Sequence, residues 1–151
     1  MLILNDDGTV LGKSYQVPIA QCYFKGNPSP PSNPPVTWSV GQNDIVHYRW
    51  ALSGEMMDLS FQIHGSPGGV LSADSDGALI KFPPGYRLAE HTQYNGVGGF
   101  FNEGGLGYGR MYISASSGDP TWFGFGDWQD RLFKAGVLRA WGGCRFRVEK
   151  F

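Results

Sequence analysis

The sequence has no long apolar run and no surplus of charge of one sign. Its apolar runs extend over only a few residues, far short of the ~20 that a membrane-spanning helix needs. Twelve Lys and Arg residues against thirteen Asp and Glu residues leave a net charge of −1, so the chain lacks the basic surplus that neutralises nucleic-acid phosphates. Residues 1–8 lack the basic region and apolar stretch of a signal peptide, so nothing indicates export. We therefore expect neither a membrane nor a nucleic acid as a partner.

Cysteine is scarce, and its spacing is not that of a metal site. The two cysteines, Cys22 and Cys144, lie far apart in the sequence, whereas zinc sites need clusters such as C-x₂-C. We predict no metal and no other cofactor. A disulfide between the two cysteines is one interpretation, and a pair of buried free thiols is the interpretation we favour.

Catalytic motifs are missing as well. The sequence contains no G-x-S-x-G elbow, H-E-x-x-H motif or P-loop, and His47, His64 and His91 share no metal-binding pattern. Glycoside hydrolysis uses carboxylates that are paired in space rather than in sequence. Nothing singles out a pair among the carboxylates of the aromatic-rich half: Glu90, Glu103, Asp119, Asp127 and Asp130. The sequence therefore predicts a protein that is not an enzyme, with a glycoside hydrolase or lyase as the third class considered.

Two glycine-containing motifs have simple interpretations. Asp74–Gly77 resembles the start of a calcium loop but lacks the further acidic ligands at fixed spacing, so it is predicted to be a turn. Gly104–Gly109 does not fit the G-x-G-x-x-G pattern and has no βαβ context, so it is predicted to connect a hairpin.

Glycine and aromatic residues are abundant. The chain has 23 Gly, ten Phe, seven Tyr and five Trp residues. Tight turns use glycine at positive φ, and aromatic side chains suit half-buried pleated surfaces. No window of helical length carries an i, i+3, i+4 apolar stripe, and residues 127–134 form at most one helical turn. The composition predicts an all-β sandwich.

The clearest alternation of apolar and polar residues predicts a hairpin of residues 46–52 and 57–63 around a turn at 53–55. Its apolar positions are expected on one face: Val46, Tyr48, Trp50, Leu52, Met57, Leu59, Phe61 and Ile63. Further strands are predicted at 78–82, 111–115, 122–125, 137–138 and 144–148. With a short strand-like segment within residues 1–26, the total is about eight strands, which is a jelly-roll number.

The N-terminal region differs from the rest. Residues 26–35 contain five prolines, which favours an extended, semi-rigid polyproline segment. We interpret residues 1–35 as an extended N-terminal arm with a Pro-rich linker, and residues 36–151 as one β-sandwich domain. The candidate anchoring residues of the arm are Leu2, Ile3, Leu4, Tyr15 and Val17.

Three segments resemble the small jelly-roll domains of tailed-bacteriophage particles. Residues 48–63 resemble their opening hairpin, Ile80–Arg87 resembles a recurring step of strand, proline and Gly-Tyr, and Trp141–Val148 resembles their final strand. The resemblance spans residues 36–151. It implies a C1q- or TNF-like jelly roll, commonly a homotrimer, on the surface of a virion assembled in the host cytoplasm.

Such domains decorate capsids or form the tips of tail fibres. No fibrous shaft precedes the domain in this sequence, which favours a capsid decoration (cement) protein. We expect its arm to bind the major capsid protein or another virion protein by adding a strand to an exposed sheet edge.

The alternative is a receptor-binding tail-fibre knob or a carbohydrate-binding module that recognises a host-surface glycan. Its candidate residues are the densest aromatic group with a neighbouring amide: Trp122, Phe125, Trp128 and Gln129. Aromatic faces can pack against the C–H faces of a sugar. The competing interpretation, which we favour, places these aromatic residues in the core or in a subunit interface.

Overall fold

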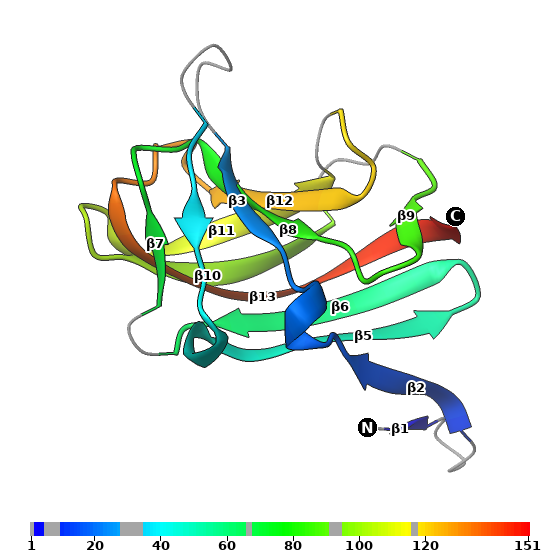
Figure 1. Ribbon diagram of the computed structural model, residues 1–151. Helices are drawn as coiled ribbons and strands as arrows, with labels where there is room; N and C mark the ends of the chain where they lie inside the picture. The colour runs from blue at the N-terminus through cyan, green and yellow to red at the C-terminus, as the bar shows by residue number, and fades with distance from the viewer. Residues whose placement is uncertain (1, 5–9, 28–34, 66–67, 91–94, 116–117) are drawn as a thin grey trace.

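The structure of the protein, a computed structural model, describes residues 2–4, 10–27, 35–65, 68–90, 95–115 and 118–151, with the backbone alone for 2–4 and 10–13. Its elements are strands and two 3₁₀ turns, so the prediction of an all-β fold is confirmed (Figure 1). The strands are β1 (Leu2–Leu4), β2 (Val10–Gln16), β3 (Phe24–Asn27), β4 (Trp38–Ser39), β5 (Ile45–Ser53), β6 (Met56–Ile63), β7 (Gly69–Leu71), β8 (Gly77–Lys81), β9 (Tyr86–Leu88), β10 (Gly96–Asn102), β11 (Gly107–Ala115), β12 (Trp122–Asp127) and β13 (Gly136–Lys150). The turns are η1 (Ile19–Gln21) and η2 (Gln42–Asp44).

Antiparallel pairing joins the strands into one sheet with the order β1-β2-β5-β6-β13-β10-β11-β12-β8-β3. Strand β13 lies between β6 and β10, and it also pairs with β7 near its start and with β9 at its end. Strands β10, β11 and β12 follow one another as hairpins, and β13 returns beside β10, which is the spatial order of a Greek key. This strand order does not confirm the finer prediction of a jelly roll.

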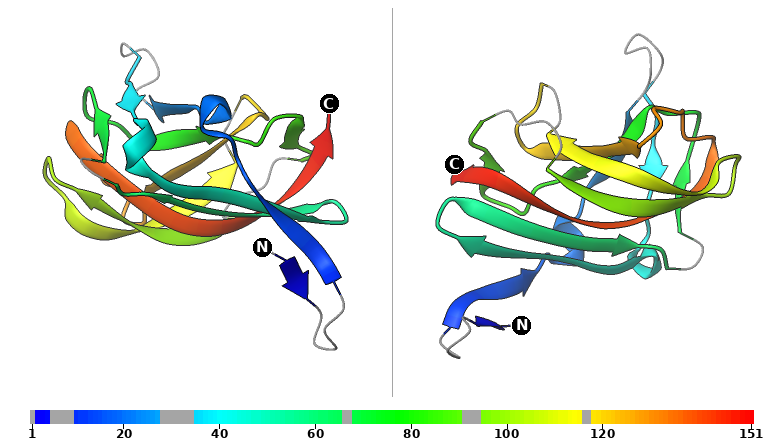
Figure 2. Two further views of the ribbon diagram at one scale, coloured as in Figure 1. Left: turned by 60° about the horizontal axis from the view of Figure 1, so that its bottom comes forward. Right: turned by 180° about the vertical axis from the view of Figure 1, so that it is seen from behind.

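The sheet curls until its two ends face each other across one core (Figure 2). Strands β6 and β12 are separated by three strands in the sheet, yet the rings of Phe61 and Phe123 have centroids 6.1 Å apart. The hydroxyl of Tyr48 on β5 donates a hydrogen bond of 2.8 Å to the carbonyl of Lys81 on β8. The curl therefore buries the inner face of the sheet as the two layers of a sandwich would.

Glycines occupy the inner face where β10 and β13 cross the middle of the sheet. Gly98 lies opposite Gly142 in the register of these strands. A Cβ atom on Gly98 would overlap the carbonyl oxygen of Trp141, and one on Gly142 would lie 2.9 Å from Cδ1 of Ile113. Glycine in a strand interior marks such close approaches and sharp bends.

The predicted hairpin is present as β5 and β6, with one correction. The four residues of β6 that the alternation assigns to the inner face are all buried: Met57, Leu59, Phe61 and Ile63. Val46, however, is 54% exposed, because the register of β5 against β6 shifts between Ile45 and His47. The extra residue of this bulge turns Val46 away from the inner face.

Residues 10–27 cross the open side of the curl. Ser14–Gln16 pair with β5 at one end of the sheet, and β3 pairs with β8 at the other end. Between them, Val17 is 1% exposed, and its amide donates a hydrogen bond of 2.8 Å to the carbonyl of Tyr48. This part of the predicted arm is built into the sheet, whereas the β1–β2 hairpin projects beyond β5 (Figure 1). Most of the Pro-rich linker, residues 28–34, lies outside the described residues.

Candidate functional site

Strand β12 separates the predicted aromatic group into two faces. Phe123 and Phe125 are buried, and the ring of Phe125 lies 5.5 Å from that of Trp38 and 6.2 Å from that of Phe61. Phe125 is therefore a core residue with little exposed surface, although it also contributes to the lining of the pocket described below. The alternate positions of β12, from Trp122 onward, belong to the outer face of the sheet.

At the Trp122 end of β12, the outer face of the sheet carries two lysine side chains close to the Trp122 ring. The ammonium of Lys25 lies 4.3 Å from the centroid of the Trp122 ring, and that of Lys81 lies 5.6 Å from it. Asp119 lies beside them and accepts hydrogen bonds from the amide (2.9 Å) and hydroxyl (2.7 Å) of Thr121. These hydrogen bonds, with help from the charges of both lysines, lower the pKa of Asp119, so its carboxylate is ionised at neutral pH.

Trp128 and Gln129 lie at the other end of β12. Trp128 is 51% exposed, and the guanidinium of Arg110 lies 5.9 Å from its ring. Trp128 follows Trp122 by six positions, which corresponds to roughly 20 Å along an extended chain. The structure thus keeps Trp128 and Gln129 on the surface, but it does not bring them together with Trp122 and Phe125 into one platform.

The chain after β12 is held by an ion pair between the buried Asp127 and the exposed Arg131. Asp127 is 1% exposed and accepts three bonds from Arg131, from its amide (3.1 Å), its Nε (2.7 Å) and its Nη2 (3.1 Å). Burial raises the pKa of Asp127, but the hydrogen bonds and charge of Arg131 outweigh that effect and hold the pKa below its ordinary value. Residues 127–134 form this capped turn and no helix, so Asp127 has a structural role.

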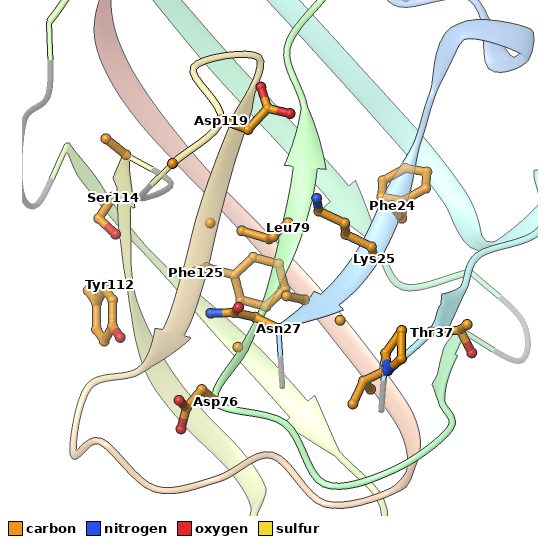
Figure 3. Close-up of a pocket in the computed structure, with 18 of the residues that line it drawn as sticks. Phe24, Lys25, Asn27, Thr37, Asp76, Leu79, Tyr112, Ser114, Asp119 and Phe125 are labelled. Atoms are coloured by element: carbon orange, nitrogen blue, oxygen red, sulfur yellow. The ribbon is translucent and has the colours of Figure 1, made fainter. Parts of the chain in front are cut away.

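Between the two ends of β12, the outer face is hollowed into a trough of about 850 Å³ (Figure 3). Its floor includes Gly124, at which a Cβ atom would lie 2.8 Å from Cδ2 of Leu79. The polar side chains of the lining come from β3, β11 and the adjoining loops: Lys25, Asn27, Thr37, Asp76, Tyr112, Ser114, Asp119 and Asp130. Figure 3 shows Asp119 at one end of the trough and Asp76 at the other.

Sequence analysis missed most of this lining. Tyr112 and Ser114 lie on β11 at the positions that alternate with buried Met111 and Ile113, so they were recognisable as outward-facing but not as parts of a site. Gly124 in the interior of a strand was the one local signal of a hollow. Residues of β3 reach the trough from about a hundred positions earlier in the chain, and no local pattern reports such a contact.

The five carboxylates considered for glycoside hydrolysis do not lie together in the structure. Asp119 and Asp130 line the trough, whereas Asp127, Glu90 and Glu103 do not. Of the histidines, Nε2 of His47 lies 2.9 Å from Oγ of Ser60, and His91 lies outside the described residues. The ring of His64 lies edge-on to that of Trp141.

The arm residues have different environments. Leu2, Ile3 and Leu4 form β1, whose backbone pairs with β2. Tyr15 is 45% exposed and stacks on Trp50 at 4.8 Å. Val17 is buried in the core, so it stabilises the domain and is not accessible to a partner.

Three further features of the chain concern its cysteines, its potential metal ligands and its potential membrane spans. Both cysteines are free thiols. Within the described ranges, no group of three or more His, Cys, Asp or Glu side chains gathers to hold a metal ion. No helix in this part of the chain has the length and hydropathy to span a membrane.

Comparison of the chain with models of known protein families, with curated proteins and with solved structures finds no match. The site must therefore be interpreted from its own residues.

Proposed function

We propose that this protein is a non-enzymatic structural protein of a phage particle, a decoration protein that attaches to the outer capsid surface through its β1–β2 hairpin. The resemblance of residues 48–63, 80–87 and 141–148 to the domains of tailed-phage particles supports this assignment. The partner would be the major capsid protein or another virion protein, and the location would be the virion surface.

The pairing of the hairpin is the observation that carries the proposal. Only Ser14–Gln16 of β2 pair with β5, whereas Val10, Gly12 and Lys13 pair with β1. Strand β1 stands last in the sheet order, and its outer edge pairs with no other strand among the described residues. Such an edge presents N–H and C=O groups to which another chain can add a strand.

We also propose that the protein assembles as a homotrimer. A trimer would present three hairpins to the shell, and simultaneous binding would multiply weak individual contacts into strong attachment. Light scattering coupled to size-exclusion chromatography should give three times the chain mass of 16.6 kDa. A monomer at micromolar concentration would contradict the trimer.

Particle binding tests the hairpin. The full chain and a variant lacking residues 1–13 are mixed with purified particles that lack the protein, and the bound copies are counted by quantitative mass spectrometry against the major capsid protein. We expect copy numbers comparable to the capsid protein for the full chain and at least tenfold fewer for the variant. Tyr108→Ser, at a 77% exposed position on β11, is the control and should bind normally.

Two results would contradict the proposal. Full binding by the shortened variant would exclude the hairpin as the anchor. A handful of copies of the full chain per particle would move the protein to the tail and favour the receptor-binding alternative. Circular dichroism of each variant confirms that the sheet is folded.

A further inference from the structure

We propose that the trough on the outer face of β12 binds a neutral saccharide, held by hydrogen bonds from side chains of β3, β11 and the loops around it. This site is separate from the hairpin, and it does not depend on attachment to a capsid. Its volume of about 850 Å³ lies within the range typical of small-molecule sites.

The strand at the floor of the trough, β12, has no free edge to which a peptide strand could be added. The backbone of β12 pairs with β11 along one side, from Met111 to Ala115, and with β8 along the other. The strand ladders on both sides therefore engage its main-chain groups. A ligand lying on β12 must therefore be recognised by side chains, as a saccharide is. An extended peptide at a sheet edge is instead recognised by main-chain hydrogen bonds.

The charges of the lining exclude polyanions. The charged lining residues are one cation, Lys25, and three carboxylates, Asp76, Asp119 and Asp130. A nucleic acid or a polysulfated chain would meet a net negative site, and phosphate binding needs the opposite charge. An acyl chain would in turn leave these polar groups without hydrogen bonds, which carries a desolvation cost.

A neutral, polyhydroxylated ligand matches the hydrogen-bonding groups of the lining. Each sugar hydroxyl can donate one hydrogen bond and accept others. Carboxylates only accept, ammonium groups only donate, and an amide does both, so Asp119, Lys25 and Asn27 together satisfy hydroxyls in either role. Figure 3 shows acceptors at both ends of the trough, with the lysine and the amide between them.

Two features of the site are present before any ligand binds: an oriented carboxylate and an uncovered stretch of backbone. The hydrogen bonds from Thr121 orient the Asp119 carboxylate and hold its pKa below the ordinary value, so it accepts at neutral pH without reorganising. The absence of a side chain at Gly124 lets a ligand approach the sheet itself. A preorganised polar site loses less conformational entropy on binding.

Binding by the full chain to a printed array of neutral and acidic oligosaccharides tests the proposal, with titration calorimetry of the strongest binder. Ser114→Trp fills the trough from β11 without altering the core. Ser60→Trp makes the same substitution at an exposed position on the outer face of β6 and serves as the matched control. We expect a neutral oligosaccharide to bind, Ser114→Trp to weaken it at least tenfold, and Ser60→Trp to leave it unchanged.

Several outcomes would overturn the proposal. They are binding of no saccharide, binding of acidic saccharides alone, and equal binding by Ser114→Trp and the unaltered chain. If Ser114→Trp does not fold, Asn27→Ala, which removes an exposed amide, replaces it and should also weaken binding. The variant lacking residues 1–13 should keep full saccharide affinity, which separates this site from the hairpin.

Discussion

Tyr48 makes a hydrogen bond that spans the core. Its side chain is fully buried, its ring lies edge-on to Phe123 at 6.3 Å, and its hydroxyl donates to the carbonyl of Lys81. Because β5 lies near one end of the curled sheet and β8 near the other, this bond ties the two halves of the sheet together.

Removing that hydroxyl should destabilise the fold without opening a large cavity. We expect Tyr48→Phe to lower the free energy of unfolding by about 1–2 kcal/mol, because the Lys81 carbonyl loses its buried partner. Urea denaturation measures the difference. Tyr108→Phe, at a mostly exposed position, is the control, and equal stability of the two variants would show that the bond contributes nothing.

The two thiols should differ in reactivity. Cys144 is 7% exposed, and burial raises the pKa of its thiol, so little reactive thiolate forms. Cys22 is only half-buried, although burial raises its pKa too. We expect a native chain to react with one equivalent of Ellman's reagent and a denatured chain with two. Cys22→Ser should abolish the reaction of the native chain. Rapid labelling of both thiols in the native chain would contradict the burial of Cys144.

At the scale of single residues, the aromatic group of the sequence identified candidates but did not separate core residues from surface residues. Phe125 and Trp122 both belong to an aromatic group in the sequence, yet one lies in the core and the other on the outer face. Val17 was assigned to an arm because it precedes the proline-rich segment of residues 26–35. Its burial depends on contacts with β5, about thirty residues later, which local sequence does not encode.

At the scale of the elements, the close pairing of β10 with β13 depends on glycine. Gly98→Ala should lower the free energy of unfolding by about 1–3 kcal/mol, because the new methyl group would force the Trp141 carbonyl and Met111 to move. Gly143→Ala is the matched control on β13, since its Cβ atom would meet only the Leu59 carbonyl at 3.6 Å. Thermal and urea unfolding compare the two variants. A Gly98→Ala variant as stable as the control would show that the sheet relaxes freely there.

Strands with a long alternation of apolar and polar residues could be predicted from the sequence, and the shortest strands could not. Strands β5 and β6 combine long alternation with a tight turn, so both could be placed from the sequence. Strands β3, β4, β7 and β9 contain two to four residues each, too few to show a period. Their pairing depends on distant partners, as β3 pairs with β8 some fifty residues later, and tertiary contacts of this kind override local propensity.

Across the whole molecule, three carboxylates link stability to pH. Asp74 accepts hydrogen bonds from the amide of Ala135 (3.0 Å) and the ammonium of Lys134 (3.3 Å), and these bonds lower its pKa. Asp119 and Asp127 also have lowered pKa values, for the reasons given for each. All three are therefore more acidic in the folded chain than in the unfolded chain.

The sign of this linkage predicts acid sensitivity. A carboxylate with a lowered pKa stabilises the fold above its unfolded pKa, about 4, and this contribution is lost as pH falls through the folded value. We expect the free energy of unfolding to stay level from about pH 7 to 5 and to decrease below about pH 4. Asp127→Asn should show a smaller decrease, and equal stability of the unaltered protein at pH 7 and pH 3 would contradict the linkage.

At this largest scale the sequence indicated an all-β chain, but it did not reveal how the sheet closes. Composition and alternation predict strands, and neither reports that residues 10–27 connect the two ends of the curl. That closure is set by non-local pairing. For the same reason, a fold rich in such contacts is expected to form slowly compared with helical bundles of the same size.

The central position of β13 has a consequence for synthesis. It follows all the other strands in sequence and lies between β6 and β10 in space. A ribosome adding about 5–20 residues per second releases the earlier strands before β13 exists. During that interval β6 and β10 are two open edges that can pair with each other or with a neighbouring nascent chain. Native pairing of the whole sheet therefore waits for translation of the last strand.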